Sequence, residues 1–254
     1  MKNKSVERDE LAKYLAAALD INRFRDYCPN GLQVQGAASV KHMVTGVTAS
    51  LALLEAAHAA GADTVLVHHG YFWRGEDPRV VGTFHKRLKF LLEHDMNLFA
   101  YHLPLDAHAE WGNNVQLGKL LGLTINRYFG EQDLGCLADV NNAVSTVGDL
   151  QTKIEKILGR SPLLIGDVAK NLNTIAWCTG AAQQSFAEAI AAGADIYISG
   201  EISEQTVHLA RESGVAYLAC GHHATERYGV QAIGQHCASQ FGISHQFIDI
   251  PNPV

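Results

Sequence analysis

The sequence lacks the features of disulfide-stabilised, exported and membrane-spanning proteins. Its five cysteines are odd in number, widely spaced and without a CxxC pair, so neither a disulfide framework nor a thiolate zinc site is indicated. No apolar run approaches the roughly 18 residues of a membrane span, and the charged N-terminal segment has no uninterrupted apolar core. These absences predict a cytoplasmic protein with reduced thiols and no membrane partner.

The fingerprints of several large enzyme classes are also missing. No P-loop, GxGxxG or GxSxG occurs, which argues against nucleotide-dependent phosphoryl transfer, dinucleotide-dependent redox chemistry and serine hydrolysis. The net charge of -6 argues against a broad basic surface for nucleic acid. What is abundant is histidine: thirteen among 254 residues, and 47% hydrophobic residues supply enough apolar material for one large or two small domains.

Predicted strands and helices alternate along the chain. A helix with one buried stripe is predicted at 5–20, followed by a strand at 40–47, a helix at 50–60 and a strand at 64–67. This order is typical of a βαβ unit with a parallel sheet. The sequence therefore predicts an α/β fold.

The same unit recurs in the second part of the chain. Gly61-Ala62-Asp63 aligns with Gly193-Ala194-Asp195, and in both copies an Ala-rich helix stops at the glycine and a short strand follows. Helix-Gly-Ala-Asp-strand is common in α/β proteins, so two unrelated units are the alternative. We predict two related α/β halves, residues 1–128 and 129–254, whose mainly parallel sheets face each other across a metal-binding cleft.

Ligand-type side chains follow four of the predicted strands. They are His68 and His69 before Gly70, His102 and Asp106 in HLPLD, Glu201 in SGE, and His222 with Glu226 in GHHATE. Ligands collect at the carboxyl ends of strands in open parallel sheets, because the loops diverge there. We therefore expect a functional site at this edge.

Histidine and carboxylate at these ends suggest metal binding. His68 and His69 would point to opposite faces of a regular strand, but Gly70 frees the backbone to turn, so both can converge on a metal pair. The alternative places one histidine in the core and the other in solvent. Asp106 is suited to bridge two cations, or alternatively to cap a helix. His222 and Glu226, or His223 and Glu226, share one face if a helix opens there.

Imidazole nitrogen with carboxylate oxygen suits zinc, iron, manganese, cobalt or nickel. Two such divalent ions, roughly 3.5 to 4 Å apart, lower the pKa of a bridging water and support hydrolysis. Glu201 and His102 are candidate catalytic groups, as a general base, an orienting group or a proton donor, and a structural hydrogen bond is the alternative for both. Tyr71-Phe72-Trp73-Arg74 could stack a nucleobase and touch phosphate, or alternatively lie in a subunit contact.

At these residues the chain resembles the family of hexameric proteins with a dinuclear metal centre, which includes YbgI-like bacterial proteins named GTP cyclohydrolase I type 2 homologues. The resemblance covers nearly the whole chain and is weakest between about 126 and 172. The matching segments are PNGLQV (29–34), GVTAS (46–50), GADTVLVHHGYFW (61–73), HLPLDAH (102–108), WCTG (177–180), SGEISEQTVHLARE (199–212), GHHATERYG (221–229) and FIDIPNP (247–253).

The resemblance implies a site, an assembly and an activity. The two metals of the family would be bound by His68, His69, Asp106, His222 and Glu226, in a toroid of six identical subunits with the sites facing an inner cavity. We predict a two-metal hydrolase, with metal-bound hydroxide as nucleophile and a nucleotide-derived or phosphorylated small molecule as substrate. The alternative is a non-catalytic ring that buffers metal or serves as an interaction scaffold.

Overall fold

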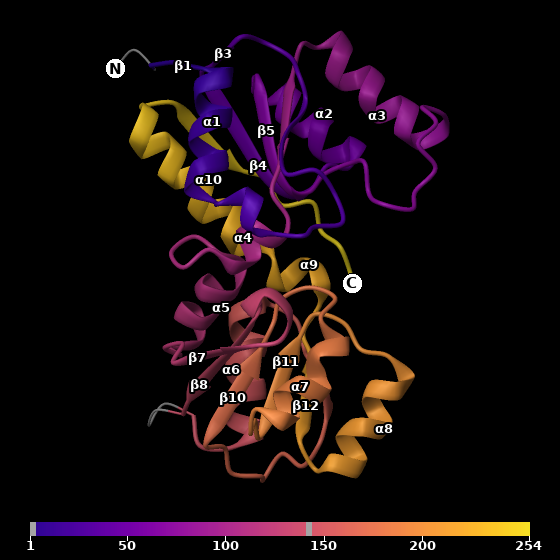
Figure 1. The fold of residues 1–254 in the computed structure, drawn as a ribbon, viewed down its shortest axis with the longest axis vertical. Coiled ribbons are helices and arrows are strands. Elements are labelled where there is room, and N and C mark those ends of the chain that lie inside the picture. Colours follow the sequence, from indigo (N-terminus) through magenta and orange to yellow (C-terminus); the bar gives the residue numbers. More distant parts are fainter. Residues whose placement is uncertain (1–3, 141–143) are drawn as a thin grey trace. The chain divides into compact units, whose positions relative to one another are not determined.

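The computed structural model describes residues 4–140 and 144–254, which divide into two compact units. The first unit comprises the chain up to Trp111 together with Gly229–Pro251, and the second comprises Gly112–Tyr228 together with Asn252–Val254. Among the described residues, no helix is both long and apolar enough to cross a lipid bilayer. Figure 1 shows the helices and strands of both units.

The first unit contains a five-stranded sheet in the order β13-β4-β5-β6-β2. Its strands are β2 (Gly31–Val34), β4 (His42–Thr48), β5 (Thr64–His69), β6 (Asn97–Ala100) and β13 (Ser244–Phe247). The three pairings among β13, β4, β5 and β6 are parallel, and β2 adds to β6 in the antiparallel direction. A short antiparallel pair, β1 (Val6–Glu7) with β3 (Ser39–Val40), lies outside this sheet.

Helices cover both faces of this sheet (Figure 1). The helices of the unit are α1 (Arg8–Ala18), α2 (Leu51–Ala59), α3 (Gly82–Glu93), α4 (Leu103–Ala107) and α10 (Arg227–Phe241), with a 3-10 turn at Ile21–Arg23. Successive strand residues point to opposite faces, so Leu66 packs with α1 and α10 whereas its neighbours Val65 and Val67 pack with α2 and α3. Both faces are buried, which explains the nearly continuous apolar strands.

The second unit has a six-stranded sheet in the order β7-β8-β10-β11-β12-β9. Its strands are β7 (Arg127–Phe129), β8 (Gly135–Asp139), β9 (Leu163–Ile165), β10 (Thr174–Trp177), β11 (Ile196–Ser199) and β12 (Ala216–Ala219). Its helices are α5 (Asn113–Leu121), α6 (Val147–Leu158), α7 (Phe186–Ala191), α8 (Glu204–Ser213) and α9 (His222–Thr225), with 3-10 turns at Glu131–Asp133 and Gln183–Ser185. α5 and α6 pack on one face of the sheet, and α7 and α8 on the other.

The expectation of mainly parallel sheets is correct for the first unit and needs correction for the second. Among the described strands of that unit, β10–β11 and β11–β12 pair in parallel, while β7, β8 and β9 pair in the antiparallel direction. The turn between β7 and β8 is too short for a crossover, which a parallel pairing requires. The α/β class itself is confirmed.

The repeated unit has the same local structure in both copies. β5 begins at Thr64 and β11 begins at Ile196, so each strand starts directly after the aspartate of its Gly-Ala-Asp motif. In each copy the motif's aspartate accepts, through Oδ2, two backbone N–H groups at or beside the start of the preceding strand. The donors are Lys41 and His42 for Asp63, and Asn173 and Thr174 for Asp195, at 2.7 to 3.1 Å. This shared arrangement supports two related halves.

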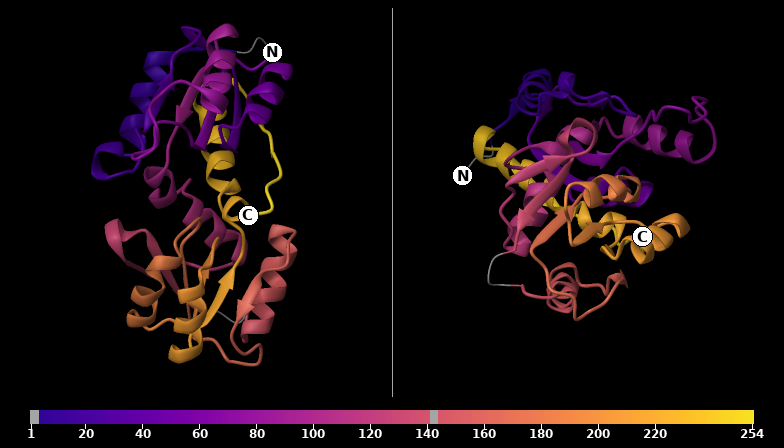
Figure 2. Two further views of the ribbon diagram at one scale, coloured as in Figure 1. Left: turned by 90° about the vertical axis from the view of Figure 1, so that its right-hand side faces the viewer. Right: turned by 60° about the horizontal axis from the view of Figure 1, so that its bottom comes forward.

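The units differ from the predicted halves 1–128 and 129–254. Residues 229–251 lie with the first unit, because β13 pairs in parallel with β4 and α10 packs on the same sheet. Figure 2 shows this yellow C-terminal segment beside the indigo N-terminal elements. α5 and β7, predicted in the first half, belong to the second unit, where β7 pairs with β8.

Candidate metal centre

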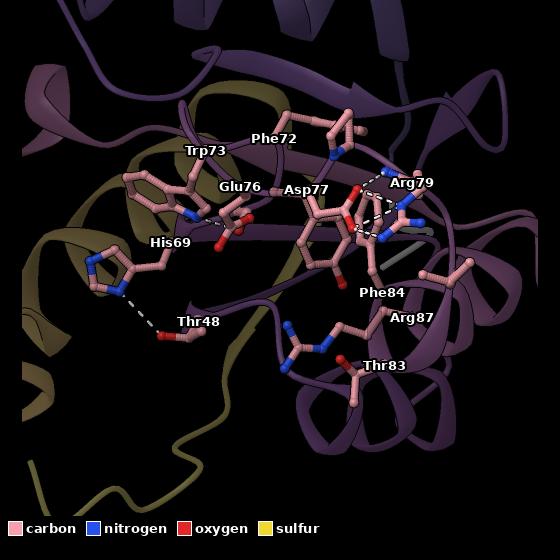
Figure 3. Close-up of a pocket in the computed structure, with 14 residues that line it drawn as sticks. Thr48, His69, Phe72, Trp73, Glu76, Asp77, Arg79, Thr83, Phe84 and Arg87 are labelled. Atoms are coloured by element: carbon pink, nitrogen blue, oxygen red, sulfur yellow. Dashed lines mark hydrogen bonds and ion pairs between the residues drawn. The ribbon is translucent and has the colours of Figure 1, made fainter.

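His68 and His69 are the last two residues of β5, at the carboxyl end of a central strand. The His68 ring is fully buried, and its Nδ1 lies 2.9 Å from the carbonyl oxygen of Tyr101. A carbonyl can only accept, so Nδ1 carries a proton and donates it, and Nε2 is the nitrogen left for another partner. Nδ1 of His69 pairs at 3.2 Å with the hydroxyl of Thr48 (Figure 3). The Nδ1 contact therefore orients each ring, and the Nε2 of each ring is not part of that contact.

The two rings converge although both residues belong to the strand. Their centroids lie 4.5 Å apart, with ring planes 49° apart. Gly70 does not have a positive φ, so the predicted backbone freedom is not its role. A Cβ at Gly70 would collide with the Gln33 side chain and with Ala100 Cβ, so this position needs glycine for a close approach of chains.

His102 is the N-cap residue of α4, and hydrogen bonds hold both its backbone and its ring. Its backbone N–H donates to Asn30 Oδ1 at 2.7 Å, and its Nδ1 donates to Asp26 Oδ1 at 2.6 Å. Asp26 Oδ2 accepts the backbone N–H of Leu103 at 3.0 Å. Burial raises the pKa of Asp26, but the bonds from His102, Asn30 and Tyr27 outweigh it and hold the pKa at about 2. The carboxylate is therefore ionised and fixes Nδ1–H on His102.

This carboxylate–histidine pair was not predicted from the sequence. Paired carboxylates of this kind orient metal-binding histidines and raise their basicity. Asp26 stands just before the PNGLQV segment, so its place beside a recognisable motif was the one available signal. Arg74 anchors the same loop by donating to the Asp26 carbonyl at 3.0 Å.

Asp106 lies inside α4, with 7% of its surface exposed. Its Oδ1 is 3.4 Å from His68 Nε2. The alternative of an N-cap role does not apply, because His102 occupies the cap position of this helix. A buried carboxylate needs a compensating positive charge. A cation bound by both Asp106 Oδ1 and His68 Nε2 would supply it.

The first unit therefore gathers four of the predicted site residues. One ligand-type nitrogen from each of His68, His69 and His102 lies within 4.8 Å of the other two, and Asp106 faces His68. Asp26, Cys28 and His102 form a second group of the same closeness. Burial raises the pKa of Cys28, with a further contribution from Asp26, to about 12, so its thiol stays protonated. Nitrogen and carboxylate are the donors that this cluster offers.

The second unit gathers the other three predicted residues, Glu201, His222 and Glu226. His222 Nδ1 pairs with Glu201 Oε1 at 2.8 Å, and His222 Nε2 pairs with Glu226 Oε2 at 3.1 Å. Burial lowers the pKa of His222, but the two glutamates outweigh it and raise the pKa to about 9. Glu226, which is 2% exposed, pairs with His222 rather than with the neighbouring His223 in these ion pairs.

Gly180, in the WCTG segment, makes room for Glu226. Its φ is +72°, and a Cβ at this position would collide with Glu226 Oε1. Its N–H donates to Thr225 Oγ1 at 3.1 Å, and its carbonyl accepts from Ser199 Oγ at 3.1 Å. Gly180 is a second position that the sequence reasoning did not single out, because glycine carries no ligand atom.

Several remaining histidines have structural contacts. His236 pairs with the Tyr14 hydroxyl at 2.6 Å, and His245 pairs with Thr45 Oγ1 at 2.9 Å. His108 Nδ1 accepts the backbone N–H of Trp111 at 3.0 Å. These three histidines therefore have local structural contacts of their own.

Comparison with known proteins gives a match over almost the whole chain. Residues 6–253 match the family described as Duf34/NIF3 (NGG1p interacting factor 3). The chain belongs to the Duf34/NIF3 family. A Pseudomonas aeruginosa relative named GTP cyclohydrolase 1 type 2 homolog is 53% identical over 97% of this chain and 96% of its own. An Escherichia coli K12 relative of the same name is 47% identical over the full length of both chains.

Solved structures of similar proteins share the fold. A structure of protein ybgI, described as of unknown function, has a TM-score of 0.94 and 45% identity, covering 98% of this chain and all of its own. A crystal structure of a Thermus thermophilus protein has a TM-score of 0.88 and 31% identity, with the same coverage. The resemblance inferred from the motifs is thereby confirmed.

Proposed function

We propose that this chain is a two-metal hydrolase whose metals are bound by His68, His69, Asp106, His222 and Glu226. The observation that carries the proposal is the cluster in the first unit, where His68, His69 and His102 bring ligand-type nitrogens within 4.8 Å. A hydrogen bond at Nδ1 orients each ring, and Asp106 faces the Nε2 of His68. Oriented imidazoles with a buried carboxylate are the chemistry of a divalent-cation site.

The donor set fits zinc, iron, manganese, cobalt or nickel. When bound, two such cations acidify water and neutralise charge on a leaving group. In this proposal Glu201 orients His222 by accepting from its Nδ1, and His102 moves a proton at Nε2 while Asp26 holds Nδ1–H. The substrate is a nucleotide-derived or phosphorylated small molecule, in keeping with relatives named GTP cyclohydrolase 1 type 2 homolog.

The proposal also includes the cellular setting and the assembly. All five cysteines are free thiols, which suits the reducing cytoplasm. We extend to this chain the homohexameric ring that the resemblance implies. Mass measurement in solution tests the ring: a species of six 27.6 kDa chains is expected, and a monomer at all concentrations contradicts it.

The deciding experiment measures metal content and turnover on the same protein. Protein purified without chelator is assayed for metal per subunit and for hydrolysis of a panel of nucleotides and phosphoesters. Close to two metals with metal-dependent turnover is expected, with both reduced in Asp106→Asn. Glu55→Gln on the exposed side of α2 is the matched control, because it makes the same carboxylate-to-amide change away from the cluster.

Two other outcomes have defined meanings. Two metals without turnover on any substrate would favour the alternative of a metal-buffering ring or scaffold. In that case Asp106→Asn should lower thermal stability sharply, because the metals would then serve to stabilise the fold and not to catalyse a reaction. Absence of bound metal in the wild-type protein would contradict both functions.

A further inference from the structure

A pocket of about 580 Å³ opens in the first unit beside His69. Its lining consists of Thr48 at the end of β4 and of residues from His69 through the following loop into α3, among them Trp73, Phe84 and Arg87 (Figure 3). The volume lies within the range of pockets that hold small-molecule ligands. Because His69 is both a lining residue and a proposed metal ligand, a molecule in this pocket would reach the proposed metal centre.

Aromatic side chains form much of the lining. Phe84 meets Tyr71 and Phe72 edge to face, with ring centroids 5.5 and 5.7 Å apart, and the Trp73 ring lies 6.0 Å from His69. Trp73 is fixed by its Nε1, which donates to the Gly70 carbonyl at 3.1 Å. Rigid aromatic faces of this kind suit a planar ring.

Phe72 adopts an unusual backbone conformation at this pocket. Its φ is +65°, which is rare for a bulky residue, and 45% of its surface is exposed. Holding a phenylalanine in this region costs on the order of 1 kcal/mol, and such strain tends to occur at binding sites. An exposed aromatic ring beside a pocket also gains free energy when a ligand covers it.

The two arginines of the lining, Arg79 and Arg87, differ in whether another side chain binds them. Arg79 is held by the Asp77 carboxylate through bonds of 2.6 to 2.9 Å. Within residues 4–140 and 144–254, by contrast, no hydrogen bond or ion pair involves the guanidinium of Arg87, which points into the pocket (Figure 3). Glu76 adds one carboxylate to the lining, so the pocket suits a ligand with one anionic group rather than a polyanion.

We propose that this pocket binds the recognition end of the substrate: a planar heterocycle packed against Trp73 and Phe84, with one phosphate held by Arg87. Guanidinium matches phosphate with two parallel N–H donors, which gives the pocket both affinity and orientation. The assignment rests on the proposed function, and it narrows the substrate to a phosphorylated heterocycle whose phosphate lies away from the metals. Arg74, which the sequence offers as a phosphate contact, is not part of this lining and donates to the Asp26 carbonyl.

The test compares binding of guanosine 5′-monophosphate, guanosine and inorganic phosphate by calorimetry and tryptophan fluorescence. The monophosphate should bind more tightly than either part alone. Arg87→Ala should lower the affinity for the monophosphate roughly ten- to a hundredfold, because a charge-assisted bond is lost, and should leave the affinity for guanosine unchanged. The affinity of Arg87→Lys for the monophosphate should lie between those of the wild type and Arg87→Ala. Lys86→Ala, the neighbouring exposed residue of α3, is the matched loss of one positive charge and should change affinity little.

Variants of the metal cluster separate this site from the proposed activity. In Asp106→Asn depleted of metal, the monophosphate should still bind, because the lining belongs to residues 48 to 87. Four results would each overturn the assignment. The monophosphate fails to bind once metal is removed, guanosine binds as tightly as the monophosphate, phosphate alone binds as tightly as the monophosphate, or Arg87→Ala keeps the wild-type affinity. Binding without turnover would contradict the hydrolase alone, whereas turnover with an unchanged KM in Arg87→Ala would contradict this pocket alone.

Discussion

At the scale of single residues, the tautomer of each imidazole decides which nitrogen faces the candidate metal centre. A backbone carbonyl fixes His68, and the ionised Asp26 fixes His102. Removing the fixing group leaves the imidazole in place but allows its ring to turn or exchange tautomer. The consequences should therefore appear in function more than in folding.

We expect Asp26→Asn to lower turnover or metal affinity about 10- to 100-fold, the usual effect of removing the carboxylate behind a functional histidine. The metal content of Asp26→Asn then decides the role of His102. Two bound metals with slow turnover indicate that His102 transfers a proton, and loss of one metal indicates that His102 is a metal ligand. Asp20→Asn, an exposed position six residues earlier, is the matched control. Full activity and unchanged metal affinity in Asp26→Asn would remove Asp26 from the site.

Gly180→Ala should impair metal binding through Glu226. The added Cβ would collide with Glu226 Oε1, and alanine at positive φ adds strain of roughly 1–2 kcal/mol. Gly193→Ala provides the matched control, because its φ is +88° and nothing lies within 4 Å of its Cβ. Both variants should lose similar stability from strain, while calorimetric titration with metal should show lost affinity only in Gly180→Ala. Equal metal affinity in the two variants would contradict this account.

At the scale of helices and strands, local patterns predicted the elements that carry the motifs. The helix predicted at 50–60 is α2, at Leu51–Ala59, and the Ser50 side chain caps it by accepting the backbone N–H of Leu53. The predicted strand at 64–67 continues as β5 to His69. The contacts of Asp26 and Gly180 were beyond prediction, because both residues act on partners distant in sequence and neither belongs to a periodic pattern.

β13 carries a pH-sensitive contact with β4 and α10. Burial lowers the pKa of His245, and the neighbouring His42 lowers it further. Its Nε2 pairs with Thr45 Oγ1, and its ring lies where a Cβ on Gly234 would be. The neutral ring is therefore favoured in the folded chain. Its contribution to stability is fully present above about pH 6.5 and is lost as the pH falls through the lowered pKa.

Urea unfolding at pH 7.5 and pH 5 tests this contact. The free energy of unfolding should fall more between these pH values in the wild type than in His245→Gln, which keeps a hydrogen-bonding side chain that does not titrate. His85→Gln on exposed α3 controls for loss of a histidine as such. Identical losses in wild type and His245→Gln would show that His245 contributes nothing to the pH dependence.

At the scale of the whole molecule, the chain leaves the first unit after Trp111 and returns to it at Gly229. The second unit is nearly continuous, at Gly112–Tyr228, whereas the first needs Gly229–Pro251 to complete its sheet and core. The sequence predicted the two α/β halves from the repeat but placed this return in the wrong half. Strand order is set by long-range pairing, which local periodicity does not encode.

This topology predicts unequal behaviour of the separated units. Residues 112–228 should fold alone, with cooperative unfolding in urea, because their sheet is covered on both faces by their own helices. Residues 1–111 alone should not fold, since they lose β13 and the fully buried Val230, Ile233 and Cys237 of α10. At roughly 1.5–3 kcal/mol for each large side chain, this loss is comparable to the whole stability of a domain, about 5–15 kcal/mol.

Joining residues 1–111 to 229–251 through a flexible Gly/Ser linker should restore the first unit. Circular dichroism and urea unfolding of the linked chain should then show a cooperative transition that 1–111 lacks. A linker of the same composition at the end of 1–111, without the C-terminal segment, controls for solubility. If 1–111 alone unfolds cooperatively, then β13 and α10 are attachments to a sheet that is already stable, and their loss would cost far less than their burial implies.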